Sequence, residues 1–324
     1  MKKNGSLLSV SDLHTYFFSG KQVIKAVQNV SFEIKRGEVF GLVGESGCGK
    51  TMTALSVIRL VPVPGKIVQG SIDFEGKNLV VLSDEEMQQV RGGRIGMIFQ
   101  EPLTSLNPVL RIGDQISETL LVHKNLSADQ ARSSSIELLA KVGLDRPEKR
   151  YLQYPHQLSG GQRQRVLIAI AIACHPALII ADEPTTALDV TIERQILRLL
   201  QNLVGESDMS MLFITHNLNI IKRIGQRIGV MYAGRMVEQA PVNEFFENPL
   251  HPYSKGLLAS MPQFSRDCDR LSAIPGSVPR LSEIPQGCTF HPRCPNATAI
   301  CTQEEPPPLE TGVERWVRCF LYQN

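Results

Sequence analysis

The sequence lacks an excess of charge of either sign. Its 324 residues carry 34 Lys and Arg against 32 Asp and Glu, which leaves a net charge of +2. A protein that binds nucleic acid through its electrostatic field needs a marked positive excess, so the charge balance does not favour that class of function. With 42% hydrophobic and 20% charged residues, the composition is that of an ordinary globular protein with a sizeable core.

Long hydrophobic runs are also missing. The longest apolar stretch, residues 166–181, spans 16 residues and is interrupted by His175 and Pro176. A membrane-spanning helix needs about 20 consecutive apolar residues, so none is expected. The N-terminus begins with Lys2 and Lys3 but has no apolar segment behind them, so no secretory signal is evident. We therefore expect a cytosolic protein.

Cysteines are few and unevenly placed. Cys48 and Cys174 stand alone, and the other five of the seven crowd the C-terminal part, at positions 268, 288, 294, 301 and 319. In a cytosolic chain of this length a disulfide framework is not expected, and such a cluster indicates metal binding more often.

Strand and helix signals alternate along the first 240 residues. Apolar spacing predicts strands at 7–18, 23–34, 38–43, 67–74, 95–99, 177–181, 211–214 and 228–232, and helices at 50–60, 127–142 and 190–204. This alternation predicts an α/β fold with a largely parallel sheet. An antiparallel β portion is expected at the N-terminus and a helical subdomain at about 103–173. Ser127 is a plausible N-cap of its clearest helix.

The composition changes after about residue 241. Prolines become frequent, and only 253–261 shows helical spacing. We expect one main domain over 1–245 and a loop-rich C-terminal extension over 246–324. A segment of this kind has little core of its own and needs a covalent or metal link to hold it.

A phosphate-binding loop is the strongest motif. Residues 44–51, GESGCGKT, match G-x-x-x-x-G-K-[ST] in full, between a strand ending at Val43 and a helical segment starting at Lys50. Backbone N–H groups of such a loop surround a polyphosphate at a helix N-terminus. Lys50 is expected to neutralise the β- and γ-phosphates of ATP, and the Thr51 hydroxyl to ligate Mg²⁺. The candidate nucleotide-binding residues are Gly44, Glu45, Ser46, Gly47, Cys48, Gly49, Lys50 and Thr51.

Two carboxylates follow a second buried strand. Asp182 and Glu183 come directly after the apolar run LIIA, at the strand end where α/β sheets bind their ligands. Asp182 is expected to interact with Mg²⁺, and Glu183 is expected to polarise the water that attacks the γ-phosphate.

The segment LSGGQ at residues 158–162 indicates the family. With the two motifs above, it makes the chain resemble ATP-binding cassette (ABC) ATPases over about 240 residues. The resemblance implies adenine stacking on Phe17, a γ-phosphate and Mg²⁺ contact from Gln100, and a switch histidine at His216. Catalysis would rest on Glu183, His216 and Gln100. Two further motifs imply nucleotide contacts, made by Ser159, Gly160, Gly161, Gln162 and Asp189 (of the D-loop Ala187-Leu188-Asp189).

The signature loop also implies assembly. Its serine and glycine amides begin a helix and form a second anion site, which in this family faces the γ-phosphate held by another cassette. The chain has one cassette, so it must pair with itself or with a similar subunit.

Two positions depart from the family pattern. Cys48 stands where relatives often carry Ser, and we expect its thiol to be sensitive to reagents. Asn217 replaces the Asp that commonly follows the switch histidine, but Asn is a good helix N-cap, so little loss is expected.

Further segments resemble one ABC subfamily. Residues 52–157 are too few for the coiled-coil arms of repair ATPases, and no second phosphate-binding loop or fused membrane segment is present. Four segments resemble the ATPase subunits of oligopeptide, dipeptide and nickel importers: FQEPLTSLNP (99–108), DEPTTALDVT (182–191), NPLHPYS (248–254) and IPGSVP (274–279). This implies a bacterial inner-membrane complex of two different ATPase subunits, two permeases and an extracytoplasmic solute-binding protein. The chain would lie at the cytoplasmic face.

The late cysteines favour a metal group. The gaps between Cys288, Cys294, Cys301 and Cys319 are wider than those of an ordinary zinc knuckle. Four thiolates on loops suit an iron–sulfur cluster. The resemblance to the importer subfamily implies that this is a [4Fe–4S] cluster. Zinc and unliganded thiols stay open as alternatives. Cys268 falls outside the spacing, and His291 is expected to be a surface residue and not a ligand.

The sequence does not identify the solute. Peptide import is the leading interpretation, and an ATPase for nickel or antimicrobial-peptide transport stays open because the permeases and binding protein select the solute. A redox-sensing regulatory ABC ATPase is an alternative of another class.

Overall fold

The computed structural model describes residues 5–20, 22–186, 188–206, 208–261 and 274–323. The chain forms two compact units, one of residues 1–7, 34–38 and 81–213, the other of residues 8–33, 39–80 and 214–324. Within the described residues, no helix is long and apolar enough to cross a membrane.

An antiparallel sheet forms the N-terminal part of the second unit, as the sequence predicts. Its strand order is β2 (Gln22–Lys35), β1 (Ser6–Ser19), β4 (Gly65–Phe74) and β5 (Lys77–Asn78). β1 pairs antiparallel with β4, so that Leu8 lies opposite Phe74 and Phe17 opposite Gly65. Apolar residues alternate along β1 because successive side chains point to opposite faces, and those on one face are buried.

A mixed sheet completes the second unit. β3 (Val39–Val43) pairs parallel with β9 (Arg227–Tyr232). β9 then pairs antiparallel with β10 (Arg235–Pro241), β10 with β12 (Arg315–Val317), and β12 with β11 (Leu309–Gly312). The helices of this unit are α1 (Lys50–Val57), α9 (Leu218–Ile224), α10 (Val242–Glu247) and α11 (Pro252–Ala259). All five residues of β3 are buried, as expected of a strand covered on both faces.

The first unit contains a parallel strand pair and a cluster of helices. β6 (Ile95–Ile98) pairs parallel with β7 (Leu178–Asp182), and Ser210, at the start of β8 (Ser210–Thr215), donates its backbone N–H to Ala177 O at 2.9 Å. The remaining elements are α2 (Asp84–Val90), α3 (Pro102–Ser105), α4 (Ile112–His123), α5 (Ala128–Lys141), α6 (Pro147–Tyr151), η2 (Pro155–Gln157), α7 (Gly160–Ile172) and α8 (Val190–Gly205). The short η1 (Leu79–Val81) is divided between the two units along the chain.

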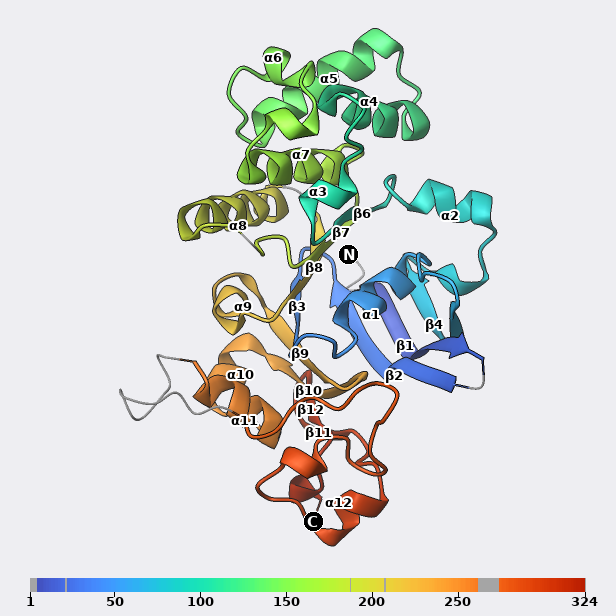
Figure 1. Ribbon diagram of the computed structural model, residues 1–324, viewed down its shortest axis with the longest axis vertical. Helices are drawn as coiled ribbons and strands as arrows, with labels where there is room; N and C mark the ends of the chain where they lie inside the picture. The colour runs from blue at the N-terminus through green and yellow to red at the C-terminus, as the bar shows by residue number, and fades with distance from the viewer. Residues whose placement is uncertain (1–4, 21, 187, 207, 262–273, 324) are drawn as a thin grey trace. The chain divides into compact units, whose positions relative to one another are not determined.

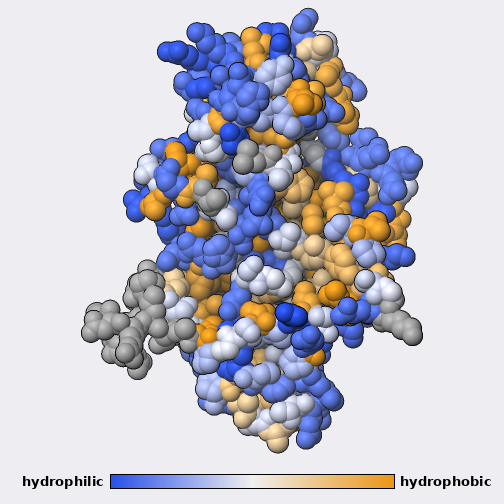
Figure 2. Space-filling model, in the orientation of Figure 1, coloured by the Kyte–Doolittle hydropathy of each residue, from blue (hydrophilic) through white to orange (hydrophobic). Residues whose placement is uncertain are grey.

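Helices α4, α5, α6 and α7 lie together (Figure 1), in the segment predicted to be helical. Ser127 caps α5 as predicted: its side chain accepts the Gln130 N–H, and the Gln130 side chain accepts the Ser127 N–H. Exposed hydrophobic side chains, among them Leu121 and Val122 of α4, interrupt the polar surface of this group, which is mostly blue with scattered orange in Figure 2.

The C-terminal extension has more regular structure than the sequence predicts. Short elements occur at η3 (His291–Arg293), α12 (Ala299–Gln303) and η4 (Phe320–Tyr322). The strands β11 and β12 were not predicted, because three or four residues are too short for a periodic signal. β12 extends the mixed sheet beside β10, so the extension is fixed to the sheet by backbone hydrogen bonds.

Candidate nucleotide site

The phosphate-binding loop runs from the end of β3 to the start of α1. Gly44, Gly47 and Gly49 have φ of 154°, 78° and 104°, and only glycine adopts such angles without strain. Packing requires two of them as well. A Cβ on Gly44 would lie 2.2 Å from Met231 O, and one on Gly49 would lie 2.5 Å from Ala26 O. The loop therefore fits closely against the neighbouring backbone of its own unit.

The helix start behind this loop has no side-chain cap. Gly49 is the N-cap of α1 and supplies no side chain, and the first N–H groups of any helix have no intrahelical partner. Lys50 is buried, and its ammonium donates to Gly44 O at 2.8 Å and to Glu45 O at 3.1 Å. The loop backbone thus curves around a buried positive charge. The half-buried Thr51 follows on the same helix.

The expected reactivity of Cys48 is wrong. Its side chain is completely buried, and burial raises the pKa of its thiol. Reagents attack the exposed thiolate, and this thiol is neither exposed nor readily ionised. The sequence motif does not show this, because the backbone around the cysteine determines its burial.

Glu45, the second residue of the loop, is held by residues that the sequence did not single out. Its backbone N–H donates to the Tyr253 hydroxyl at 2.9 Å. Its carboxylate accepts two hydrogen bonds from the Arg293 guanidinium, at 2.8 and 3.2 Å. Both partners come from the part of the chain after residue 250, and no spacing in the sequence relates them to the loop.

The other predicted residues of the second unit are Phe17 and His216. Phe17 is half-buried near the end of β1, and its ring lies against Gly65. His216 is exposed directly after β8. The neighbouring Asn217 caps α9, since its side-chain oxygen accepts the Asn219 N–H at 3.1 Å. The expectation that Asn serves as an N-cap is confirmed.

The predicted carboxylates belong to the first unit. Asp182 is the last residue of β7 and is buried. Glu183 follows with φ of 45°, a left-handed conformation that is uncommon outside glycine and occurs often at functional sites. The Glu183 carboxylate accepts hydrogen bonds from Thr186 Oγ1 at 2.9 Å and from Gln100 Nε2 at 3.3 Å. The structure therefore brings Gln100 and Glu183 together, although they are 83 positions apart.

The signature loop begins α7 in the same unit. Ser159 is its N-cap: Ser159 Oγ accepts the Gln162 N–H at 3.4 Å, and Gln162 Oε1 accepts the Ser159 N–H at 3.0 Å. Ser159 and Gly160 are exposed. Gly161 is required for packing, because a Cβ there would lie 2.7 Å from Ile192 Cγ2.

Asp189 has a capping role as well. Its carboxylate accepts the N–H groups of Thr191 and Ile192, at 3.0 and 2.9 Å, at the start of α8. Ala187 of the same motif lies outside the described residues.

Comparisons with known proteins agree with these motifs. A family model described as ABC transporter matches residues 27–186, and one described as oligopeptide/dipeptide transporter, C-terminal region, matches residues 237–301. The oligopeptide transport ATP-binding protein AppD of Bacillus subtilis is 50% identical, over 98% of each chain. The dipeptide transport ATP-binding protein DppD of the same organism is 45% identical, over 97% of this chain and 94% of that protein. The chain belongs to the ATP-binding subunits of the oligopeptide/dipeptide ABC transporter family.

Solved structures confirm the fold of this ABC ATPase. The ATP-binding cassette MJ0796, in a dimeric structure of a post-hydrolysis state bound to ADP and Pi, matches with a TM-score of 0.66 and 30% identity. That match covers 72% of this chain and 98% of the cassette. The structure of cbiO1 from Clostridium perfringens matches with a TM-score of 0.64 and 27% identity, covering 75% of this chain and 91% of that one.

The four late cysteines of this ABC subunit line one pocket. Cys288, Cys294, Cys301 and Cys319 surround it together with His251, Pro252, Phe290, His291, Asn296, Phe320 and Leu321. Burial, with a smaller contribution from the other three thiols, raises the pKa of Cys288 to about 11. Among the described residues, no group of three or more His, Cys, Asp or Glu side chains is arranged so that it could hold a metal ion.

Two expectations about this region need comment. Cys268 lies outside the described residues. His291 is half-buried and lines the pocket. Its Nδ1 lies 2.9 Å from Cys288 O, to which it donates a hydrogen bond.

Proposed function

We propose that this ABC ATPase energises the import of peptides across the bacterial inner membrane. The observation that carries the peptide assignment is the C-terminal region, whose residues 237–301 match that of oligopeptide/dipeptide transporters. Relatives named for oligopeptide and for dipeptide transport match over nearly the whole chain. The proposed location is the cytoplasmic face of the membrane, as a peripheral subunit.

The nucleotide would be held by the phosphate-binding loop. The uncapped helix start and the buried Lys50 ammonium form an environment that suits a polyphosphate. We assign the β- and γ-phosphates to Lys50 and the loop amides from Gly44 to Gly49, and adenine stacking to Phe17. Thr51, Gln100 and Asp182 would hold Mg²⁺, since hydroxyl, amide and carboxylate oxygens are ligands that this ion prefers. When bound, Mg²⁺ neutralises phosphate charge.

Glu183 would act as the general base. Its carboxylate would accept a proton from the water that attacks the γ-phosphorus, and the bond to the β–γ bridging oxygen breaks to give ADP and phosphate. The hydrogen bonds from Gln100 and Thr186 support this role, because they fix the carboxylate oxygen in one orientation. His216 would contact the γ-phosphate. Phosphoryl transfer of this kind rests on positioning and charge stabilisation.

A second cassette would complete the site. Ser159 Oγ accepts one hydrogen bond within its capping box, which leaves the hydroxyl proton to donate to a phosphate of the opposite subunit. The exposed Gly160 and the half-buried Gly161, together with Gln162 and Asp189, would contribute to the same face. The cassette MJ0796 was solved as a dimer. We propose a homologous but different ATPase as partner, together with two permeases and an extracytoplasmic solute-binding protein.

The thiol-lined pocket would hold a [4Fe–4S] cluster. Four cysteines around one pocket match the donor set of such a cluster. The bound cluster would supply a cross-link between the segments that carry the four cysteines. Cys288, Cys294, Cys301 and Cys319 are the proposed ligands.

We also propose a functional division of the chain at residue 245. Residues 1–245 would form the ATPase domain, with its helical subdomain at about 103–173, and residues 246–324 the extension that carries the cysteines. The concentration of the nucleotide motifs before residue 217 and of the thiol pocket after residue 250 supports this division.

Transport measurements test the peptide assignment. The chain would be purified with the permeases encoded beside it and reconstituted in vesicles with its binding protein. We expect di- to pentapeptides to stimulate ATP hydrolysis and to be taken up, and Lys50→Ala to abolish both. Stimulation of ATP hydrolysis by Ni²⁺ alone would show that the transported solute is nickel and not peptide. A complex that responds to neither, or a chain that copurifies with no permease, would contradict the import function.

Anaerobic purification tests the cluster. We expect brown protein with broad absorption near 400 nm and about four irons per chain. Cys294→Ser should bleach it and destabilise the extension, whereas Cys174→Ser, which changes a buried cysteine outside the pocket, should not. If the purified protein holds one equivalent of zinc and no iron, the pocket is a zinc site and the proposed cluster is wrong.

A further inference from the structure

The C-terminal extension contacts the phosphate-binding loop at the Glu45 carboxylate. Arg293 Nη1 donates to Glu45 Oε2 at 2.8 Å, and Arg293 Nη2 donates to Glu45 Oε1 at 3.2 Å. The Arg293 side chain is 4% exposed and the Glu45 side chain 32%. Paired hydrogen bonds between a guanidinium and a carboxylate are strong and directional, so this contact fixes the orientation of both groups.

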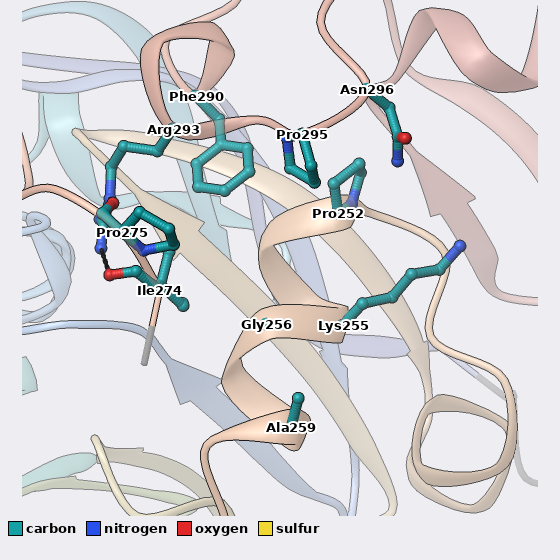
Figure 3. A pocket seen from close by; sticks show the side chains of 10 residues that line it. All are labelled: Pro252, Lys255, Gly256, Ala259, Ile274, Pro275, Phe290, Arg293, Pro295 and Asn296. Atoms are coloured by element: carbon teal, nitrogen blue, oxygen red, sulfur yellow. Dashed lines mark hydrogen bonds between the residues drawn. The ribbon is translucent and has the colours of Figure 1, made fainter. Parts of the chain in front are cut away.

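Arg293 is itself held from several sides. Its Nε donates to Pro275 O at 2.8 Å and its Nη2 to Ile274 O at 3.4 Å. The guanidinium carbon lies 5.7 Å from the centre of the Tyr232 ring. The arginine stem lines an apolar pocket between α11 and the residues that follow position 274, beside Phe290 and Pro275 (Figure 3). With so many partners, the guanidinium has little freedom to move away from Glu45.

A second contact reaches the backbone of the same residue. The Tyr253 hydroxyl accepts the Glu45 N–H at 2.9 Å, and Tyr253 is fully buried on α11. Its ring centre lies 4.7 Å from that of Tyr232 and 5.4 Å from that of Phe290. The side chain and the main chain of Glu45 are thus both anchored to one aromatic cluster, formed by Tyr232, Tyr253 and Phe290.

We propose that Arg293 is a positioning residue for ATP binding, which acts by holding the Glu45 carboxylate away from the phosphate-binding groups of the loop. Without Arg293, this carboxylate can turn towards the loop amides or the Lys50 ammonium, which are the groups that a phosphate requires. It would also add an unneutralised negative charge beside the bound polyanion. The affinity of the ATPase for nucleotide therefore depends on the C-terminal extension, a dependence that the nucleotide motifs do not contain.

Binding of MgATP to the full chain tests this proposal. Arg293→Gln should raise the Kd for MgATP about tenfold, a change of about 1.4 kcal/mol. Arg293→Lys keeps the charge but loses the paired geometry, so its Kd should lie between those of the native protein and Arg293→Gln. Glu45→Gln removes the competing charge, and it provides the background in which Arg293→Gln is measured a second time. The double variant Glu45→Gln/Arg293→Gln should bind better than Arg293→Gln alone, because residues in contact behave non-additively.

Arg315→Gln is the matched control. Arg315 is another buried arginine of the extension, and it pairs with Glu244 at 3.1 Å, far along the sequence from the loop. The Arg315→Gln variant should lose a similar ion pair and keep the native Kd for MgATP. Hydrogen exchange of a peptide covering residues 44–51, without nucleotide, should rise in Arg293→Gln and not in Arg315→Gln.

Three results would overturn the proposal. The first is a folded Arg293→Gln protein with native Kd and native exchange. The second is an equal loss of affinity in Arg315→Gln, which would assign the effect to general destabilisation. The third is a double variant that binds no better than Arg293→Gln. None of these measurements uses peptide or permease, so the proposal can fail while the peptide-import function stands, and the reverse.

Discussion

The phosphate-binding loop before α1 and the signature loop before α7 both bring glycine amides to the start of a helix, but they differ in what occupies those amides. At α1 the N-cap is Gly49, which has a left-handed conformation and offers no side chain. At α7 the N-cap is Ser159, which forms a reciprocal capping box with Gln162. The first helix start has no side-chain cap, whereas the second satisfies part of its donors within its own chain.

Their surroundings differ in the same sense. The first loop encloses the buried Lys50 and is anchored through Glu45 to Arg293 and Tyr253. The second is exposed at Ser159 and Gly160. A loop that must hold a polyanion within one subunit needs positive charge and external anchors. A loop that completes the site of another subunit needs to be stable and accessible before that subunit arrives.

Removal of the proposed general base should give the largest effect. Glu183→Gln keeps the shape of the side chain but loses the carboxylate, so hydrolysis by the assembled complex should fall by roughly 10² to 10⁴. Both loops are unchanged, so MgATP should stay bound and the complex should stall in its nucleotide-bound state. Turnover and retained nucleotide are the measurements. A native rate would show that Glu183 is not the base.

Lys50→Ala tests the first loop alone. It removes a charge-assisted interaction with phosphate worth about 1.5–3 kcal/mol, so the Kd of the isolated chain for MgATP should rise about 10- to 100-fold, measured by titration calorimetry. Ser159→Ala should leave that Kd unchanged, because we propose that its loop contacts the nucleotide of the opposite subunit. Equal losses of affinity in the two variants would remove the distinction between the loops.

Ser159→Ala tests the second loop through two measurements, the free energy of unfolding and the rate of ATP hydrolysis by the complex. Loss of an N-cap costs about 1 kcal/mol in the free energy of unfolding, which denaturant unfolding would measure. Ser127→Ala is the matched control, since Ser127 forms the same capping box at α5. Both variants should lose similar stability, but only Ser159→Ala should slow hydrolysis by the complex. A similar loss of turnover in both would reduce Ser159 to a structural cap.

The smallest effect is expected at Cys48. Because its thiol is buried and its pKa is raised, a maleimide should not modify it in the folded protein within hours. Mass spectrometry of tryptic peptides would show this, with the unfolded chain as positive control. Cys48→Ser should bind MgATP nearly as well as the native chain. Rapid modification of Cys48 in the native protein would show that the loop opens more often than the structure implies.

Much of the fold and nucleotide site could be predicted because the determining signals are local. The phosphate-binding loop, the buried strand before Asp182 and the capping residues Ser127 and Asn217 each depend on a few consecutive residues. Predictions failed where burial or long-range contact decides the outcome. Cys48 was expected to be reactive and is buried. The strands β11 and β12 were too short to show a period.

The sequence by itself determined the family, the α/β class and the order of the nucleotide motifs, because a glycine-rich turn between a strand and a helix is specified by the residues that form it. Only the tertiary structure decided which distant side chains meet. Arg293 reaches Glu45 across 248 positions, and the cysteines from 288 to 319 converge on one pocket. Such contacts depend on how the aromatic cluster and the extension pack against the mixed sheet, and packing of this kind leaves no periodic trace along the chain.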